Sequence, residues 1–209
     1  MSQFHNYKFI REYLHINFGL ELPEKLRPLT KSKLSFFAKK YEITDWVYFL
    51  DELQKCLNGK IVDDFIDIFV VGYTSFFRNR KQFDFLKKTI LPDFLDANSS
   101  NTTIDLRIWS AGCSTGEEPY SILISLMEYF GKNYNDITGG VLATDVSQKA
   151  LDYAICGQYA NIKAGAKIKG YLAPYIRNID EQTFEIKKSV RKEATFRKFN
   201  LAKGFYPFK

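Results

Sequence analysis

The chain has 209 residues, 45% of them hydrophobic, and its formal charge of +6 arises in residues 160–209, where 12 Lys and Arg face 4 Asp and Glu. This length and apolar content support a buried core in one large or two small domains and exclude a disordered chain. Cys56, Cys113 and Cys156 are isolated, which argues against a disulfide framework and a zinc or other metal site. No secretory signal is visible, and the most apolar stretch, residues 61–77, carries three aspartates that oppose membrane insertion, so a soluble cytoplasmic protein is expected.

The first third of the sequence predicts a small helical bundle, taken as an N-terminal domain of residues 1–80. Apolar residues at helical spacing predict helices over residues 7–18, 30–41, 46–57 and about 62–69. Gly19 is expected to end the first of these, and Thr44-Asp45 to cap the third. A further helix over residues 81–95 leads to a polar loop at residues 98–103.

Strands alternate with helices from Ile104 onward. Strands are expected over residues 106–110 and 140–144, and helices over 119–130 and 147–156. This spacing indicates a parallel sheet with right-handed crossovers, and hence an α/β fold. After Gly157 the pattern weakens, and residues 183–190 and 193–199 are expected to form a hairpin around Arg191-Lys192. The basic charge of this last region fits either an acidic partner, such as a glutamate-rich protein surface or nucleic acid, or a solvated face.

A small-residue turn, Ala111 to Gly116, follows the first predicted strand. Ligands of open parallel sheets bind at the carboxyl ends of the strands, where such turns let the backbone approach. The next helix begins with Glu117 and Glu118, whose carboxylates would repel a dinucleotide's pyrophosphate, and the full Gly-x-Gly-x-x-Gly pattern is absent. S-adenosylmethionine has no phosphate and carries sulfonium and ammonium groups, which suit an acidic edge. The alternative is that the glycines only form the turn and the carboxylates only complement the helix dipole.

Asp145 ends the second predicted strand, next to the first in a right-handed crossover. A carboxylate at this position can accept hydrogen bonds from both hydroxyls of a ribose. The alternative is an N-cap for the helix that starts near Ser147. Together with the turn at residues 111–116, Asp145 favours a nucleoside site.

Four segments resemble the successive motifs of the chemotaxis-receptor methyltransferases, the CheR family. They are Thr74-Ser75-Phe76-Phe77-Arg78, residues 110–121 (SAGCSTGEEPYS), Ala143-Thr144-Asp145 and Phe199-Asn200-Leu201. The resemblance implies an N-terminal helical bundle and a partial Rossmann-like methyltransferase sheet in residues 81–209, with a small antiparallel β subdomain near residues 180–199. It also implies transfer of a methyl group from S-adenosylmethionine to glutamate side chains of chemoreceptors.

The resemblance assigns roles to individual residues. Arg78 is placed to orient the incoming carboxylate, and is therefore the expected catalytic residue; its alternative is a surface ion-pair residue. The expected cofactor-binding residues are Thr74 and Arg78 at the methionine end, Ala111 and Gly112 in the turn, Glu118 at the ammonium, Asp145 at the ribose, and Asn200 with Leu201 at the adenine. A glutamate substrate is already ionised at neutral pH, so no general base is required.

The resemblance also implies partners. The basic residues Lys31, Lys33, Lys39 and Lys40 would face the cytoplasmic domains of chemoreceptors, and in some members the β subdomain binds a receptor tail. Nucleic acid is not expected as a partner, because the resemblance of residues 110–121 to the family motif counts against a nucleic-acid methyltransferase.

Two departures from the family pattern stand out. Gly72 replaces a usual Asn, and the chain stops before the further strands of complete members, including a Cys-Arg-Asn motif. The first strand is therefore expected to be an open edge. Two alternatives to a complete enzyme follow. Another chain supplies the C-terminal half, or the protein is a non-catalytic module that binds the cofactor or docks on receptors.

Overall fold

The computed structural model describes residues 3–25, 27–55, 59–70, 72–100, 103–160, 170–203 and 206. The chain divides into two compact units, which are Met1–Val71 with Phe199–Lys209, and Gly72–Lys198. These units differ from the expected domains, 1–80 and 81–209, at residues 72–80 and 199–209; the expected domain boundaries stay a prediction. Among the described residues, no helix is long and apolar enough to cross a membrane.

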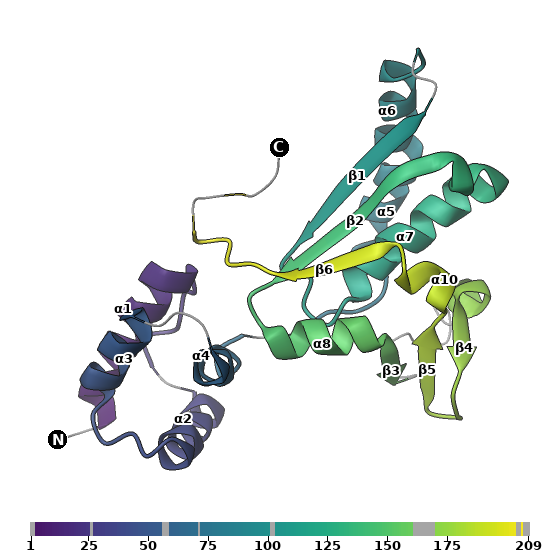
Figure 1. Cartoon of the computed structure of the whole chain (residues 1–209). Coiled ribbons are helices and arrows are strands. Elements are labelled where there is room, and N and C mark those ends of the chain that lie inside the picture. The colour runs from purple at the N-terminus through teal and green to yellow at the C-terminus, as the bar shows by residue number, and fades with distance from the viewer. Residues whose placement is uncertain are drawn as a thin grey trace. The chain divides into compact units, whose positions relative to one another are not determined.

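The described part of the first unit is helical, as expected (Figure 1). Its helices are α1 (Gln3–Phe18), α2 (Pro28–Lys40), α3 (Trp46–Lys55) and α4 (Lys60–Ile66). Gly19, at φ +63°, follows the end of α1, and the Asp45 carboxylate caps α3 by accepting a hydrogen bond from the Val47 amide at 2.8 Å. Both boundary predictions are therefore confirmed, whereas the expected end of the third helix near residue 57 lies outside the described residues.

The core of this unit is aromatic. Phe65 of α4 is fully buried, and its ring lies within 6.2 Å, centroid to centroid, of five other aromatic rings. These rings belong to Tyr13, Phe37, Trp46, Phe49 and Phe69. Each of the four helices contributes to this cluster, so ring packing joins all of them, beside buried aliphatic side chains such as Leu14 and Ile66.

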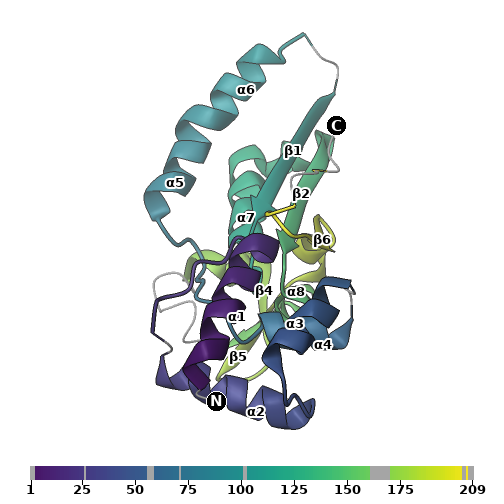
Figure 2. The same ribbon diagram turned by 90° about the vertical axis from the view of Figure 1, so that its left-hand side faces the viewer.

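The second unit begins with a run of consecutive helical segments, which are α5 (Arg80–Phe85), the π-helical turn η1 (Leu86–Ile90) and α6 (Leu91–Ala97). Figure 2 shows them as one rod that leads to β1 (Ile104–Ala111). After β1 come α7 (Glu117–Phe130), the short 3-10 helix η2 (Gly131–Asp136), β2 (Ile137–Asp145) and α8 (Gln148–Cys156). The predicted order of strands and helices is therefore confirmed.

The main sheet has the order β1-β2-β6 in the described residues, and both pairings are parallel. Ala111 is in register with Thr144, and Asp145 with Lys198 of β6 (Ala194–Lys198), so the carboxyl ends of all three strands share one edge. Apolar side chains of the strands join clusters with the helices: Leu106 with Leu91 and Leu126, Val141 with Tyr120 and Leu123, and Ala143 with Leu151. The predicted fold class, a helical bundle followed by a partial Rossmann-like sheet, is confirmed.

A second, antiparallel sheet follows α8, as expected, although its strands lie within residues 158–186 rather than in the expected 180–199. Its strands are β3 (Gln158–Ala160), β4 (Ile176–Asn178), which follows the short 3-10 helix η4 (Ala173–Tyr175), and β5 (Thr183–Ile186), in the order β3-β5-β4. The expected hairpin of residues 183–190 and 193–199 is wrong. The short helix α10 (Lys188–Arg191) separates the two segments, and β6 pairs with β2 instead, which places its Phe196 against the clusters of the main sheet.

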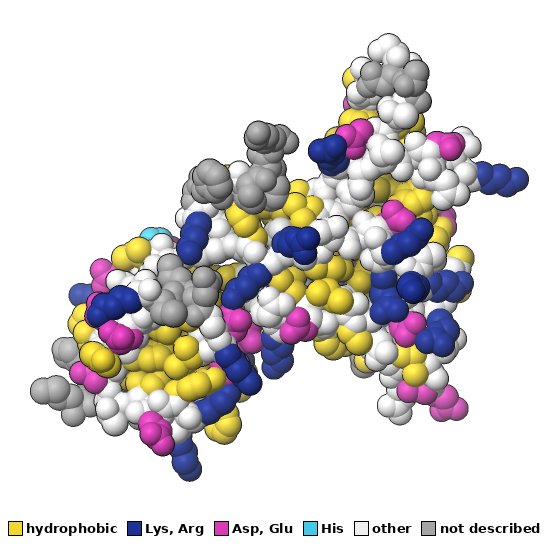
Figure 3. Space-filling model, in the orientation of Figure 1, with side chains coloured by type: hydrophobic (Ala, Val, Ile, Leu, Met, Phe, Trp, Pro, Cys, Tyr) yellow, Lys and Arg dark blue, Asp and Glu magenta, His cyan; other side chains and the backbone are white. Residues whose placement is uncertain are grey.

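Basic side chains gather around α10. Figure 3 shows this cluster in dark blue on the face that Figure 1 presents. Lys187, Lys188, Arg191 and Lys192 lie in or beside the helix. These four side chains form a basic cluster beside the small sheet.

Candidate functional site

The turn between β1 and α7 is fastened to the end of β2. The backbone amides of Gly112 and Cys113 both donate to the carbonyl oxygen of Thr144, at 2.8 and 2.9 Å. Gly112, Ser114 and Gly116 all have positive φ angles, of +76°, +50° and +91°. Such a backbone is favourable for glycine and strained for serine, so its surroundings must hold it in place.

Asp145 provides much of that support. Its Oδ2 accepts a hydrogen bond from the Ser114 amide at 2.7 Å, and its Oδ1 accepts one from the Ser147 amide at 2.9 Å. The N-cap alternative for Asp145 is wrong, because Ser147 caps α8 by accepting from the Ala150 amide at 3.1 Å. Since each carboxylate oxygen has two lone pairs, Asp145 can still accept hydrogen bonds from a ligand.

The two glutamates at the start of α7 differ in their surroundings. Glu117 is fully buried and accepts a hydrogen bond from the Thr115 hydroxyl at 2.6 Å, whereas Glu118 is exposed and accepts one from the Ser110 hydroxyl at 2.7 Å. The acidic edge expected for a cationic ligand is therefore Glu118, while Glu117 supports the turn from within.

The segment that contains Thr74 and Arg78 lies beside this turn. The Phe77 amide donates to the Ser121 hydroxyl of α7 at 3.0 Å, and a Cβ atom at Gly72 would stand 3.4 Å from the Ser114 Oγ. Thr74 is half-buried, and its hydroxyl makes no hydrogen bond to another described residue. The structure therefore brings together the segment from residue 72 to 78 and the turn at residues 111–118.

Arg78 is exposed and folds back on Tyr73. Its Nη1 donates to the Tyr73 carbonyl oxygen at 3.0 Å, and the guanidinium lies 5.4 Å from the centroid of the Tyr73 ring. No carboxylate in the described part of the chain pairs with Arg78, so the alternative of a surface ion pair is not what the structure shows. An exposed guanidinium that lacks a carboxylate partner suits an incoming carboxylate.

Two observations test whether a cationic nucleoside fits. Apart from its two chain neighbours, no heavy atom of the described residues lies within 4 Å of the position that a Cβ would take at Gly112, so the backbone there is open to a ligand. The carboxylates of Glu118 and Asp145 suit positive and hydroxyl groups rather than phosphate.

The Cys113 thiol of the turn is not a nucleophile. Burial, and after it the charge of Asp145, raises the pKa of this thiol to about 12, so it stays neutral.

Asn200 and Leu201 belong to the helical unit in this structure. The Asn200 side-chain amide donates to the Asn17 carbonyl oxygen at 2.7 Å, its Oδ1 accepts from the Ala202 amide at 3.0 Å, and Leu201 is exposed. Their expected role at the adenine stays a prediction.

Sequence reasoning missed several residues that shape the turn. The Ser110 hydroxyl donates a hydrogen bond to Glu118, and the Ser121 hydroxyl accepts one from the Phe77 amide. The Tyr159 hydroxyl donates to the Thr115 carbonyl oxygen at 2.7 Å. The Ser114 hydroxyl is buried and has no hydrogen-bond partner among the described residues, and it lies beside the position where Gly72 lacks a side chain. The serines within the 110–121 motif could have indicated polar contacts at the turn, whereas nothing in the sequence indicated that Tyr159, from a distant strand, would contact it.

These features indicate the class of protein. A parallel sheet with an open glycine turn and carboxylates at its carboxyl edge fits a nucleoside-binding enzyme, and the acidic edge favours a cationic nucleoside over a phosphate ligand. Among the described residues, no group of three or more His, Cys, Asp or Glu side chains could hold a metal ion.

Comparison with known proteins then gives the family. The family described as "CheR methyltransferase, SAM binding domain" matches residues 72–209, and the chain belongs to it. The chain is 34% identical over 197 residues to a chemotaxis protein methyltransferase of Borreliella burgdorferi, which covers 92% of this chain and 68% of that protein. It is 31% identical over 204 residues to one of Listeria monocytogenes, with 96% and 72% covered. The cofactor is therefore S-adenosylmethionine, and the family supports S-adenosylmethionine-dependent methylation in chemotaxis.

Proposed function

We propose that this protein methylates glutamate side chains on the cytoplasmic domains of chemoreceptors and so tunes adaptation in the cytoplasm. The observation that carries the proposal is the juxtaposition of an acidic, glycine-opened turn with an exposed Arg78 that has no carboxylate partner among the described residues. The turn suits the cationic cofactor, and the guanidinium suits an anionic substrate. A carboxylate substrate and a sulfonium donor are the two charges that this pair of features would recognise.

Each site residue has a role in this proposal. The backbone of Ala111 and Gly112 receives the cofactor, Glu118 accepts from its ammonium group, and Asp145 accepts from its ribose hydroxyls. Thr74 and Arg78 contact the methionine end. Asn200 and Leu201 would contact the adenine.

The chemistry needs positioning rather than proton transfer. When bound, S-adenosylmethionine supplies an activated methyl group on a sulfonium. A glutamate side chain is ionised at neutral pH, since its ordinary pKa is about 4.3. Arg78 would hold that carboxylate in line with the methyl carbon, and exclusion of water from the site would raise the reactivity of both charges.

Helix α2 offers a surface for the receptor. Lys31, Lys33 and Lys39 are exposed, while Lys40 donates to the Asp64 carboxylate of α4. Leu29 and Phe36 are 68% and 72% exposed and share one helix face with Lys33 and Lys40, at spacings of three and four residues. A mixed apolar and basic stripe complements an amphipathic helix rich in glutamate, which supports a methylation helix as the partner.

The edge of the main sheet supports a second candidate. In the described residues β1 pairs only with β2, and its Trp109 remains 37% exposed. Such an edge can accept further strands, and we propose that a continuation of this chain or another chain supplies them. Without them the protein would serve as a cofactor-binding module that docks on receptors.

Incubation with methyl-labelled S-adenosylmethionine and a chemoreceptor cytoplasmic fragment tests the proposal. We expect base-labile label on the receptor that is released as methanol, and loss of that label in Arg78→Ala. Retained cofactor binding with no receptor label would eliminate the enzyme in favour of the docking module. Receptor pull-down with the charge-reversed variant Lys33→Glu, compared with Lys132→Glu, whose lysine lies outside α2, tests the docking surface separately.

A further inference from the structure

Tyr159 connects the small antiparallel sheet to the cofactor turn. It lies on β3, its side chain is fully buried, and its hydroxyl donates to the Thr115 carbonyl oxygen at 2.7 Å. The contact is tight, because a Cβ at Gly116 would come within 3.0 Å of that hydroxyl and 2.7 Å of the Ala154 Cβ. Gly116 is therefore required for the approach of β3 and α8 to the turn.

The ring of Tyr159 is fixed on several sides. It lies edge-on to Phe76 with centroids 4.9 Å apart, and 5.8 Å from Phe184 of β5. Phe76 belongs to the segment that carries Thr74 and Arg78, and Phe184 is at the centre of the small sheet. One side chain thus contacts the methionine-end segment, the small sheet and the turn.

The turn needs such a support. Ser114 and the two glycines hold positive φ angles, and Thr115 lies between Ser114 and Gly116. The Thr115 hydroxyl donates to Glu117, and the Thr115 carbonyl oxygen is the group through which β3 holds this residue. Loss of the hydroxyl at position 159 would leave that carbonyl without this donor and release the turn at its centre.

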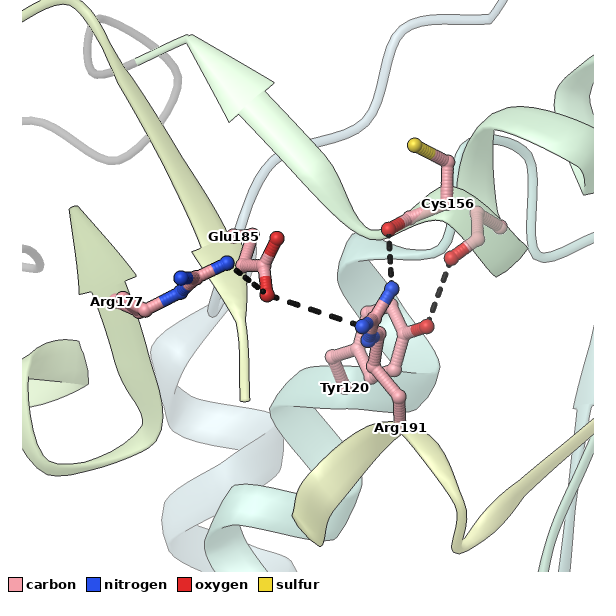
Figure 4. A network of polar contacts seen from close by, with 6 residues as sticks. Tyr120, Cys156, Arg177, Glu185 and Arg191 are labelled. Carbon is pink, nitrogen blue, oxygen red and sulfur yellow. Dashed lines mark hydrogen bonds and ion pairs between the residues drawn. The ribbon is translucent and has the colours of Figure 1, made fainter. Parts of the chain in front are cut away.

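A second tyrosine provides a matched reference. Tyr120 of α7 is also fully buried, and its hydroxyl also donates to a backbone carbonyl oxygen at 2.7 Å, that of Ala154 in α8. Figure 4 shows this bond beside Arg191, whose Nη1 donates to the Cys156 carbonyl oxygen and whose Nη2 lies 3.8 Å from Glu185. These polar contacts join α8 to α7 and the small sheet, and none of them has a donor or acceptor in residues 111–116.

We propose that Tyr159 is a positioning residue for cofactor binding: its hydroxyl holds the Thr115 carbonyl so that the backbone of residues 111–116 keeps the geometry that receives the cofactor. The proposal rests on the assignment of that turn as the cofactor seat. It makes the small sheet, through β3 and Phe184, a determinant of cofactor affinity although none of its residues is assigned to the cofactor.

The test compares Tyr159→Phe with Tyr120→Phe in the full chain. S-adenosylhomocysteine affinity is measured by calorimetry, amide hydrogen exchange of residues 111–118 in the ligand-free chain by mass spectrometry, and the melting temperature by calorimetry. We expect both variants to melt lower. Tyr159→Phe alone should bind S-adenosylhomocysteine about tenfold more weakly and exchange faster in the turn.

Phe184→Leu extends the test to the small sheet, because it leaves every hydroxyl in place and only loosens the packing of Tyr159. It should weaken binding less than Tyr159→Phe does, and an unchanged affinity would overturn the role of the small sheet. Equal affinity losses in Tyr159→Phe and Tyr120→Phe, or unchanged exchange in Tyr159→Phe, would overturn the role of Tyr159. If the unaltered chain does not bind S-adenosylhomocysteine, the seat itself is wrong, and the exchange comparison still decides whether Tyr159 holds the turn.

Discussion

The helical unit and the carboxyl edge of the sheet are stabilised in different ways. Around Phe65 the contacts are between aromatic rings, and many atoms share the stabilisation. Around the turn the contacts are single hydrogen bonds to Asp145, Thr144 and Thr115. Substitutions in the first region should therefore change stability, whereas substitutions of a few atoms in the second should change ligand affinity.

The largest expected effect is in the aromatic cluster. Phe65→Ala removes a fully buried ring that contacts five others and should lower the free energy of unfolding by about 3–5 kcal/mol. Urea denaturation followed by circular dichroism measures it. Phe65→Leu, which keeps much of the volume, is the control, and a loss below about 1 kcal/mol in Phe65→Ala would contradict the importance of ring packing.

Two glycines of the turn separate stability from binding. Gly116→Ala places a Cβ 2.7 Å from the Ala154 Cβ and should lower the free energy of unfolding by about 1–3 kcal/mol. The methyl group of Gly112→Ala points into open space, so the substitution should lower the free energy of unfolding by only about 1 kcal/mol, because of the positive φ. It should nevertheless weaken S-adenosylhomocysteine binding, because the methyl group occupies the space through which the ligand approaches the backbone. Thermal melts and calorimetric titration of both variants check this, and tight binding by Gly112→Ala would contradict the proposed seat.

The thiols test burial at the turn. Because burial raises the pKa of Cys113 to about 12, its alkylation by iodoacetamide should stay slow from pH 7 to 9, whereas the exposed Cys156 should react readily. Peptide mass spectrometry distinguishes the two sites. Similar rates at both would show that the turn is open to solvent at Cys113.

The smallest expected effect concerns a surface pair of the helical unit. Hydrogen bonds from Lys40 and then Tyr41 lower the pKa of Asp64. A lowered pKa means that this contribution is present above the unfolded pKa, about 3.9, and is lost as the pH falls below it. The melting temperature of Asp64→Asn should therefore be lower than that of the unaltered chain at pH 7 and approach it at pH 3. An equal difference at both pH values would contradict a stabilising, ionised Asp64 in the folded chain.

Local signals explain what the sequence could predict. Apolar spacing predicted α1 to α8 well, and small residues after a strand predicted the turn and the place of Asp145, because each depends on neighbours in the chain. The pairing of β6 with β2 and the bond from Tyr159 to Thr115 join segments far apart in sequence, and such contacts leave no periodic pattern. For the same reason the expected hairpin was wrong, and the support that Asp145 gives to Ser114 was missed.

Calorimetric titration with S-adenosylhomocysteine, of the unaltered chain and of Asp145→Asn, tests the central claim most directly. Asn keeps the size of the side chain and removes its charge, and Ser147→Ala, which removes the cap of α8 but leaves Asp145 in place, controls for disturbance of that helix. The account predicts one site per chain and a loss of about tenfold or more in Asp145→Asn alone. Equal affinity in Asp145→Asn and the unaltered chain would contradict it.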